Sequence, residues 1–357
     1  MILYSIAAVF PLFCWAFHEW WNRQGSLSEK KKKNFKRGMV VAAILPMFLL
    51  FVLRYKYIGS DTIGYVKFFQ TEIRKYSFFD LFDNDLMRFE IGFRLYIKIV
   101  SLFTSNYTIF FLINAIIIFG TLLRFSFKYT QNPFVFFFLF ITLGTYSFFE
   151  TGLRQALAMV ICVWAIDFLQ NRKAIRFFLL VILAYYFHKS ALIFALAYPL
   201  CSIKKYDWAM ALYAVLTIVF VVGFSAFQDT FNHWLGYEYG VEKTGNGGIF
   251  MLLTLIIAAY STFMTYDKTK QRKERPWDMH FAFMSVLFWV LRLISRTAER
   301  ISYYYMFGLY IYFSQAVDCN KDKLSSLLKW LLIGVCLLLF VYRNTGANYL
   351  FYWQGAR

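Results

Sequence analysis

Long, mostly apolar stretches recur from one end of the 357-residue chain to the other. A helix needs roughly 20 such residues to cross the hydrocarbon core of a bilayer. Only 16% of the residues are charged, whereas soluble globular domains carry about 25%. The pattern predicts an all-α polytopic integral membrane protein. It excludes an ordinary soluble enzyme, a disordered chain and a disulfide-rich secreted module.

About twelve transmembrane helices are expected by this length criterion. The N-terminal stretch is read as the first of them and not as a cleaved signal peptide, because it has no basic segment and no small-residue cleavage site. The prolines at positions 11 and 46 should kink their helices. The stretch 174–203 should form a tight hairpin broken at residues 188–190. The expected spans lie near residues 2–21, 38–53, 107–123, 131–148, 152–170, 174–188, 189–203, 207–226, 248–266, 278–295, 300–318 and 325–343.

Lysine and arginine in the short loops set the expected orientation. The net charge is +18, and its strongest blocks lie at residues 30–37 and 268–275. All basic loops are cytoplasmic if the segment 90–104 does not cross the membrane. Both termini then lie outside, and two longer loops near 54–106 and 227–247 face outward from a single membrane domain, 1–357. Orientation and anionic lipid explain most of the charge. The external basic residues are interleaved with spans and not clustered on a soluble face, which argues against nucleic acid as a partner.

The segment 90–104 carries a charged stripe along one helical face. Glu90, Arg94 and Lys98 recur every four residues, and Ile99 and Leu102 belong to a different, apolar face. This spacing predicts an amphipathic helix that lies at the outer interface or dips into a cavity. A distorted transmembrane span is the alternative.

Three arginines near the C-terminal third also recur every four residues: Arg292, Arg296 and Arg300. On a continuous helix they share one stripe and repel one another, and Glu299 neutralises only part of their charge. Guanidinium groups match phosphate oxygens in a bidentate fork, so a phosphate or pyrophosphate is a natural ligand. The alternative is a helix end whose arginines reach toward lipid phosphates.

Another arginine, Arg154, lies about one turn inside an apolar span. An intramembrane arginine is by default a candidate functional residue. Glu150 stands four residues earlier, which favours a helical ion pair of functional or purely structural importance.

Two further candidates precede and follow that span. Asp61 and Tyr65 lie one turn apart in the stretch 57–65, where Ser60 or Asp61 suits a helix cap. Asp61 also suits a base or a ligand of sugar hydroxyls. His188, at the tip of the predicted hairpin, is a proton shuttle, a phosphate ligand or a hydrogen-bonded structural histidine.

Five short motifs in this order resemble the EpsG family of bacterial exopolysaccharide polymerases, the Wzy-type enzymes. They are G-S-D-T-I-G-Y at 59–65, E-I-G-F at 90–93, L-R-Q-A-L-A at 153–158, F-H-K-S-A-L at 187–192 and R-x-x-x-R-I-S-Y-Y-Y at 296–305. They span roughly residues 50–305. The sequence contains no nucleotide-binding motif.

The resemblance implies a GT-C-like membrane glycosyltransferase at the outer face of the bacterial cytoplasmic (inner) membrane. It would move a glycan chain from undecaprenyl pyrophosphate to the next lipid-linked repeat unit. Its partners would be the undecaprenyl-pyrophosphate-linked oligosaccharide and membrane lipid, with a flippase and a chain-length regulator as further partners. A polysaccharide ligase and a flippase or transporter of lipid-linked glycans are the alternative functions.

The same resemblance assigns roles to individual residues. Asp61 is the first choice as catalytic base, followed by His188 and then Glu90. Tyr65 would hold sugars. No cofactor is expected, and no metal is required. The residues expected to bind substrate or pyrophosphate are Arg154, Gln155, Arg292, Arg296 and Arg300.

Overall fold

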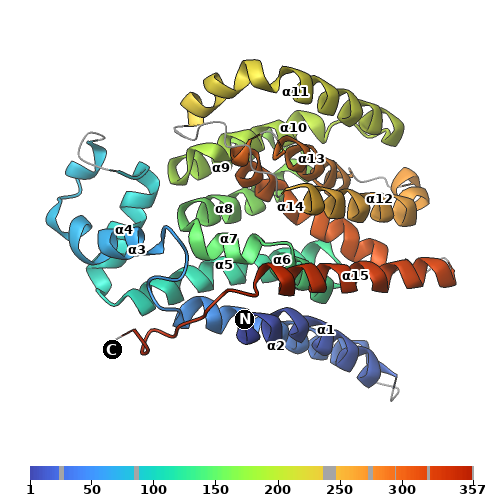
Figure 1. Cartoon of the computed structure of the whole chain (residues 1–357), viewed down its shortest axis with the longest axis horizontal. Helices are drawn as coiled ribbons and strands as arrows, with labels where there is room; N and C mark the ends of the chain where they lie inside the picture. The colour runs from blue at the N-terminus through green and yellow to red at the C-terminus, as the bar shows by residue number, and fades with distance from the viewer. Residues whose placement is uncertain are drawn as a thin grey trace. The chain divides into compact units, whose positions relative to one another are not determined.

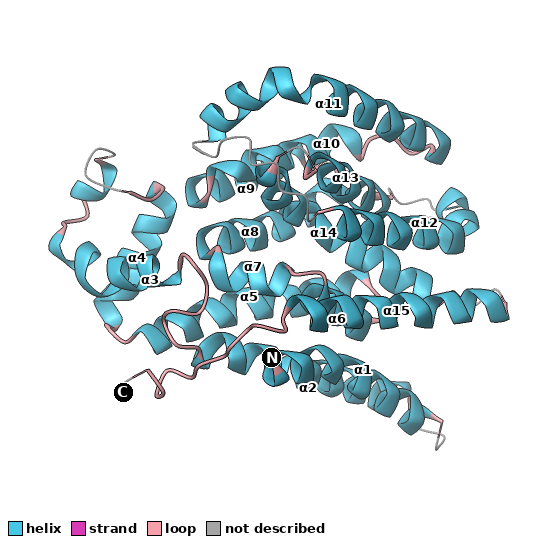
Figure 2. Ribbon diagram, in the orientation of Figure 1, coloured by secondary structure: helices cyan, strands magenta, loops and turns pink. Residues whose placement is uncertain are grey.

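A computed structural model of the chain describes residues 1–23, 28–83, 88–235, 247–271, 276–293, 295–319 and 322–355, with the side chains of residues 206, 224–235, 267–271 and 296 excepted. In this part of the chain the secondary structure is helical, with a single isolated β-bridge (Figure 2). The chain forms two compact units. Unit 1 comprises residues 1–160, 186–188 and 333–357, and unit 2 comprises residues 161–185 and 189–332.

Unit 1 begins with two long apolar helices, α1 (Ile2–Asn22) and α2 (Glu29–Leu53), which pack side by side (Figure 1). Helix α1 also packs on α6 (Pro133–Thr142), and α2 packs on α5 (Tyr107–Tyr129). Both α1 and α2 continue through their internal prolines. The basic residues 30–33 belong to the first turns of α2 and not to a loop.

The predicted span 131–148 is broken in two. Helix α6 ends before Leu143 and Gly144, and α7 (Thr145–Thr151) follows at an angle of 58°. Gly144 has φ +82°, a conformation that glycine adopts without steric cost. A second break at Gly152 separates α7 from α8 (Leu153–Gln170). These two breaks place polar side chains between apolar helices.

The predicted outer loop 54–106 is largely helical. It contains α3 (Thr62–Lys67), the π-helical turn η1 (Phe68–Glu72), the 3₁₀ turns η2 (Ile73–Lys75) and η3 (Asp80–Phe82), and α4 (Ile91–Phe103). The 13 residues of α4 extend about 20 Å, short of the roughly 30 Å of a hydrocarbon core.

The charged stripe of α4 faces the protein interior and not water. Arg94 donates to the Asp83 carbonyl at 2.9 Å, and Lys98 donates to the Ile73 carbonyl at 3.2 Å. The apolar face is the exposed one, with 61% of Leu102 and 82% of Phe103 accessible. An exposed apolar face fits a helix that lies in the membrane interface.

Unit 2 contains most of the later helices. Helix α9 (Ala174–Phe187) ends where the predicted hairpin breaks, and η4 (Lys189–Leu196) and α10 (Ala197–Leu200) follow it. Helices α13 (Trp277–Leu291) and α14 (Arg296–Val317) pack closely, because Gly308 leaves room for the Phe281 side chain. Helix α11 (Tyr206–Leu235) continues beyond the predicted end at 226, and most of the predicted loop 227–247 lies outside the described residues. Helix α12 (Gly248–Gln271) also belongs to unit 2, and α15 (Lys323–Arg343) begins in unit 2 and continues into unit 1 from residue 333.

Six helices in the described residues are long and apolar enough to cross a membrane: α1, α2, α5, α8, the Gly248–Tyr266 part of α12, and α15. The bent pair of α6 and α7 makes a seventh if it forms one span. Four shorter apolar helices coincide with other predicted spans. The helix positions therefore agree with the sequence analysis, and the number of twelve spans stays a prediction.

Candidate functional site

Arg154 and Glu90 form an ion pair within unit 1. Arg154 lies in the first turn of α8, directly after the break at Gly152, and Glu90 is the residue before α4. The Arg154 guanidinium donates to the Glu90 carboxylate. Both side chains are mostly buried, with 24% of Arg154 and 13% of Glu90 exposed. The pair therefore joins α8 to the segment between α2 and α5.

His188 approaches the same carboxylate from the end of α9. Its Nδ1 atom lies 3.8 Å from Oε1 of Glu90, and the imidazole is buried. Gly92 makes this approach possible, because a Cβ there would lie 2.8 Å from the Tyr186 carbonyl oxygen. Three sequence motifs that are far apart in the chain thus meet at one carboxylate.

Aromatic rings surround the ion pair. The Arg154 guanidinium lies over the Phe89 ring, 4.8 Å from its centroid, and hydrogen-bonds to the Tyr65 hydroxyl. Burial raises the pKa of Tyr65 more than the Arg154 charge lowers it, so the phenol stays neutral. The Nε atom of Arg154 is buried and finds no hydrogen-bond partner in the described part of the chain. A buried N–H without a partner is unusual in a folded protein and marks Arg154 as a candidate ligand-binding residue.

The surroundings keep Glu90 ionised. Burial raises the pKa of its carboxyl, but the charges of His188 and Arg154 outweigh burial and hold the pKa below the ordinary value of 4.5. A carboxylate that stays charged and accepts from an arginine is a poor proton acceptor at neutral pH. Glu90 therefore suits a residue that positions Arg154.

Asp61 lies at the start of α3 in a different environment. It precedes the first helical residue, as predicted, but its side chain makes no capping hydrogen bond. The Ser60 hydroxyl reaches its Oδ1 atom at 3.3 Å. Tyr65, one turn later, interacts with both Asp61 and Arg154. Tyr65 therefore links the segment 57–65 to the arginine.

The predicted ion pair between Glu150 and Arg154 is wrong. The four-residue spacing applies only to a continuous helix, and Gly152 ends α7 before α8 begins. The Glu150 carboxylate instead accepts from the Tyr4 hydroxyl at 3.2 and 3.3 Å. Its charge faces Arg54, which is fully buried between the rings of Phe51 and Phe111 at 4.1 and 4.4 Å.

The predicted single stripe of late arginines is also wrong. Helix α13 ends at Leu291, so Arg292 lies in a turn and α14 begins only at Arg296. Arg292 is buried and donates from Nε to Glu299 at 2.7 Å, and Tyr303 donates to the same carboxylate at 3.1 Å. Arg300 is half-buried in α14, and the side chain of Arg296 lies outside the described residues. These arginines belong to unit 2, and their meeting with Arg154 stays a prediction.

The structure gives the positions of other predicted residues but does not test their roles. Gln155 is buried in α8 beside Arg154, and its contact with substrate stays a prediction. All five cysteines are buried and none forms a disulfide. No group of three His, Cys, Asp or Glu side chains suitable for a metal ion occurs in the residues that the structure describes.

Sequence reasoning missed Arg54 and the C-terminal segment 344–355. Arg54 follows directly after an apolar span, a position where arginine usually reaches toward lipid headgroups. Its three guanidinium nitrogens are buried without hydrogen-bond partners in the described structure. The C-terminal segment is short and irregular, so no periodicity indicates that Phe351 forms a β-bridge with Arg54.

Several apolar helices of membrane-spanning length indicate a multi-pass all-α membrane protein. The model of the EpsG family matches residues 39–354, and the chain belongs to this family. The family prediction is thereby confirmed. No curated protein and no solved structure matches the chain.

Proposed function

We propose that the protein is a Wzy-type polysaccharide polymerase, a membrane glycosyltransferase that extends a glycan on a lipid carrier. Membership in the EpsG family suggests a role in exopolysaccharide biosynthesis. The observation that carries the proposal is the Arg154 site. A guanidinium is fixed by Glu90 and Tyr65, lies over Phe89 and keeps one buried N–H without a partner. Such a group suits the pyrophosphate of an undecaprenyl-linked donor.

The proposed reaction breaks the bond between the anomeric carbon of the donor sugar and the pyrophosphate oxygen. The electron pair of that bond leaves with undecaprenyl pyrophosphate. An acceptor hydroxyl of the next lipid-linked repeat unit forms the new glycosidic bond and loses its proton to a base. Arg154 stabilises the negative charge that develops on the leaving group.

Asp61 is the best supported of the three candidate bases, which are Asp61, His188 and Glu90. Glu90 and His188 surround Arg154, which fits positioning of the arginine better than proton transfer. In the described structure the Asp61 carboxylate accepts from Ser60, and the side chain lies half-exposed near Tyr65. A general base needs this access to a substrate hydroxyl.

The finer topology belongs to the same proposal. About twelve spans, both termini outside and a GT-C-like arrangement would place the Arg154 site at the outer face of the cytoplasmic membrane. Arg300 and Arg296 would add charge to the pyrophosphate site. Arg292 is less suited, because Glu299 already neutralises it.

A test in cells replaces the chromosomal gene with Arg154→Ala or Asp61→Asn. Each variant should abolish long polymer and accumulate single lipid-linked repeat units, while membrane-inserted protein stays at the wild-type level. Arg23→Ala changes an exposed arginine at the end of α1 and serves as the control with normal polymer. Polymer of wild-type length in either site variant overturns its assigned role.

The cellular products also separate the alternatives. Loss of a ligase leaves normal polymer attached to the lipid carrier. Loss of a flippase leaves single repeat units on the cytoplasmic leaflet. Repeat units that accumulate at the outer face support the polymerase.

A further inference from the structure

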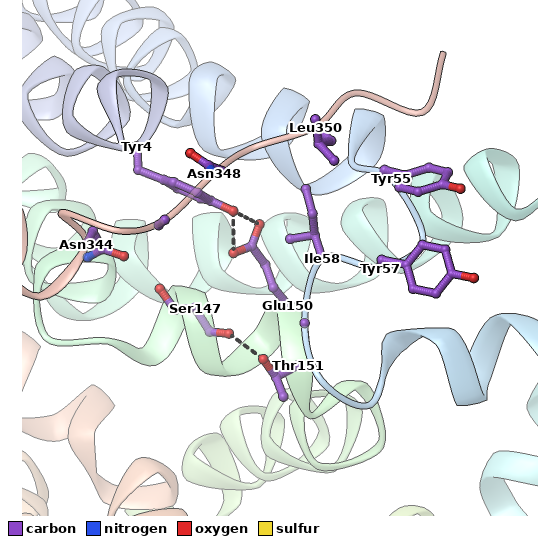
Figure 3. Close-up of a pocket in the computed structure, with 12 residues that line it drawn as sticks. Tyr4, Tyr55, Tyr57, Ile58, Ser147, Glu150, Thr151, Asn344, Asn348 and Leu350 are labelled. Atoms are coloured by element: carbon purple, nitrogen blue, oxygen red, sulfur yellow. Dashed lines mark hydrogen bonds between the residues drawn. The ribbon is translucent and has the colours of Figure 1, made fainter. Parts of the chain in front are cut away.

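A cavity of about 330 Å³ lies in unit 1. It is built around Glu150 and is separate from the predicted functional residues. Its wall includes Tyr4, Tyr57, Thr151, Asn344 and Asn348 (Figure 3). The volume is at the small end of ligand-binding pockets, which suits a ligand of about one sugar ring.

The inner side of the cavity is held by hydrogen bonds around Glu150. The Tyr4 hydroxyl of α1 donates to both oxygens of the carboxylate (Figure 3). The Glu150 carbonyl accepts from the Thr62 hydroxyl at 2.8 Å. Gly59 contacts the same carbonyl, because a Cβ at this position would lie 2.6 Å from the oxygen. The carboxylate is thus fixed before any ligand binds.

The C-terminal segment 344–355 forms the opposite wall and is tied to the end of α2. The Tyr55 amide donates to the Leu350 carbonyl at 2.8 Å, and the Tyr352 amide donates to the Leu53 carbonyl at 2.9 Å. The Tyr349 hydroxyl donates to the Leu50 carbonyl at 2.7 Å. These bonds hold the amide side chains of Asn344 and Asn348 at the cavity (Figure 3).

The chemistry of the wall selects against anions. Within the described structure the lining contains one carboxylate, amides, hydroxyls and tyrosine rings, and no lysine or arginine. A phosphate would therefore find no lysine or arginine side chain in this lining. A sugar offers hydroxyl donors to carboxylate and amide oxygens, and its apolar ring face packs on tyrosine.

We propose that this cavity is a saccharide subsite that holds one neutral sugar residue of the lipid-linked repeat unit. The segment 57–65 connects it to the reaction site: Tyr57 and Gly59 line the cavity, and Tyr65 contacts Arg154. Asp61 lies between them in the sequence. The inference deepens the proposed function and rests on it for the identity of the glycan.

Binding is measured directly with the protein in lipid nanodiscs. The probe is an oligosaccharide released by partial hydrolysis of the cell's own surface polysaccharide. Its binding to the protein is measured by saturation-transfer NMR. Tyr57→Ala and Asn348→Ala should each weaken binding at least tenfold, which corresponds to about 1.4 kcal/mol. Tyr342→Ala and Asn171→Ala replace exposed residues outside the cavity and should leave binding unchanged.

The outcomes separate the subsite from the polymerase assignment. Oligosaccharide binding that both cavity variants lose supports the subsite, even if the protein forms no polymer. Wild-type protein that does not bind the oligosaccharide, or cavity variants that bind it normally, overturns the subsite. Competition by inorganic pyrophosphate at this site also overturns it, because the lining should not accept an anion.

Discussion

Arg154 pairs with Glu90, 64 positions earlier in the chain, and not with Glu150 four positions before it. The break at Gly152 separates Glu150 in α7 from Arg154 in α8. Glu90 positions the arginine proposed to bind pyrophosphate, and Glu150 joins Tyr4 at the proposed saccharide subsite. The two residues on either side of this break therefore belong to two different polar sites.

The Arg154–Glu90 pair should matter for chemistry more than for folding. Arg154→Ala should lower the rate of glycan transfer by about 10²–10³-fold, the effect of removing a group that stabilises developing charge. Glu90→Gln should lower kcat at least tenfold with a smaller change in KM, and Glu90→Asp should restore part of the rate. Transfer is measured on purified protein with lipid-linked substrate.

Glu72→Gln serves as the matched control for Glu90, because Glu72 is 43% exposed and meets only Lys67 at 3.6 Å among the ion pairs of the described residues. Equal losses in Glu72→Gln and Glu90→Gln contradict a specific role for Glu90.

The two glycines of G-S-D-T-I-G-Y should respond differently to alanine. Gly59 has φ +91°, and a Cβ there would lie 2.6 Å from both the Glu150 carbonyl oxygen and the Thr62 hydroxyl. A Cβ at Gly64 meets nothing within 4 Å. Gly59→Ala should cost at least about 1–2 kcal/mol from backbone strain alone and should impair polymer formation. Gly64→Ala should be tolerated. The measurements are the thermal unfolding and the polymer length of the two variants, and equal effects of both substitutions would contradict the strain at Gly59.

Glu150 should contribute mainly to stability through Arg54. Both side chains are buried and their charges interact, so removing the Glu150 charge leaves the buried Arg54 with less compensation. Glu150→Gln should therefore lower the Tm of the detergent-solubilised protein strongly. The double variant Arg54→Met, Glu150→Gln should recover part of the loss. A double variant that is less stable than either single variant contradicts the electrostatic coupling.

The stability contribution of Glu90 should disappear only in acid. Its pKa is lower in the folded protein than the ordinary value of 4.5, so its stabilising effect is present above that value and is lost as the pH falls through the folded pKa. The Tm difference between wild type and Glu90→Gln should stay constant from about pH 7 to pH 5 and shrink below about pH 4. His188, Arg154 and Arg94 are the charged or titratable neighbours of this carboxylate. The same comparison in a His188→Gln background separates the histidine's own titration.

The helix positions were predictable because each depends on a local run of apolar residues. The break at His188 and the amphipathic character of α4 also follow from local patterns. The family followed from motif order. The predicted Glu150–Arg154 pair and the predicted arginine stripe were wrong because both assumed a continuous helix. One helix ends at Gly152 and another ends at the turn that contains Arg292, so residues four apart across these breaks do not share a helical face.

The remaining features depend on contacts between distant segments. The direction of the α4 stripe depends on carbonyl groups of residues 73 and 83, which accept from Lys98 and Arg94. Arg54 is buried because Phe111 and the C-terminal segment cover it. No periodicity in the sequence reports such contacts.

The most direct test of the polymerase assignment is reconstitution of the purified protein in liposomes with a lipid-linked repeat unit. A polymerase should give a ladder of longer lipid-linked glycans with release of undecaprenyl pyrophosphate. The Asp61→Asn variant should bind the substrate but form no ladder. Movement of the substrate across the membrane without new glycosidic bonds would contradict the polymerase assignment, and an unchanged ladder with Asp61→Asn would contradict the role of Asp61 as base.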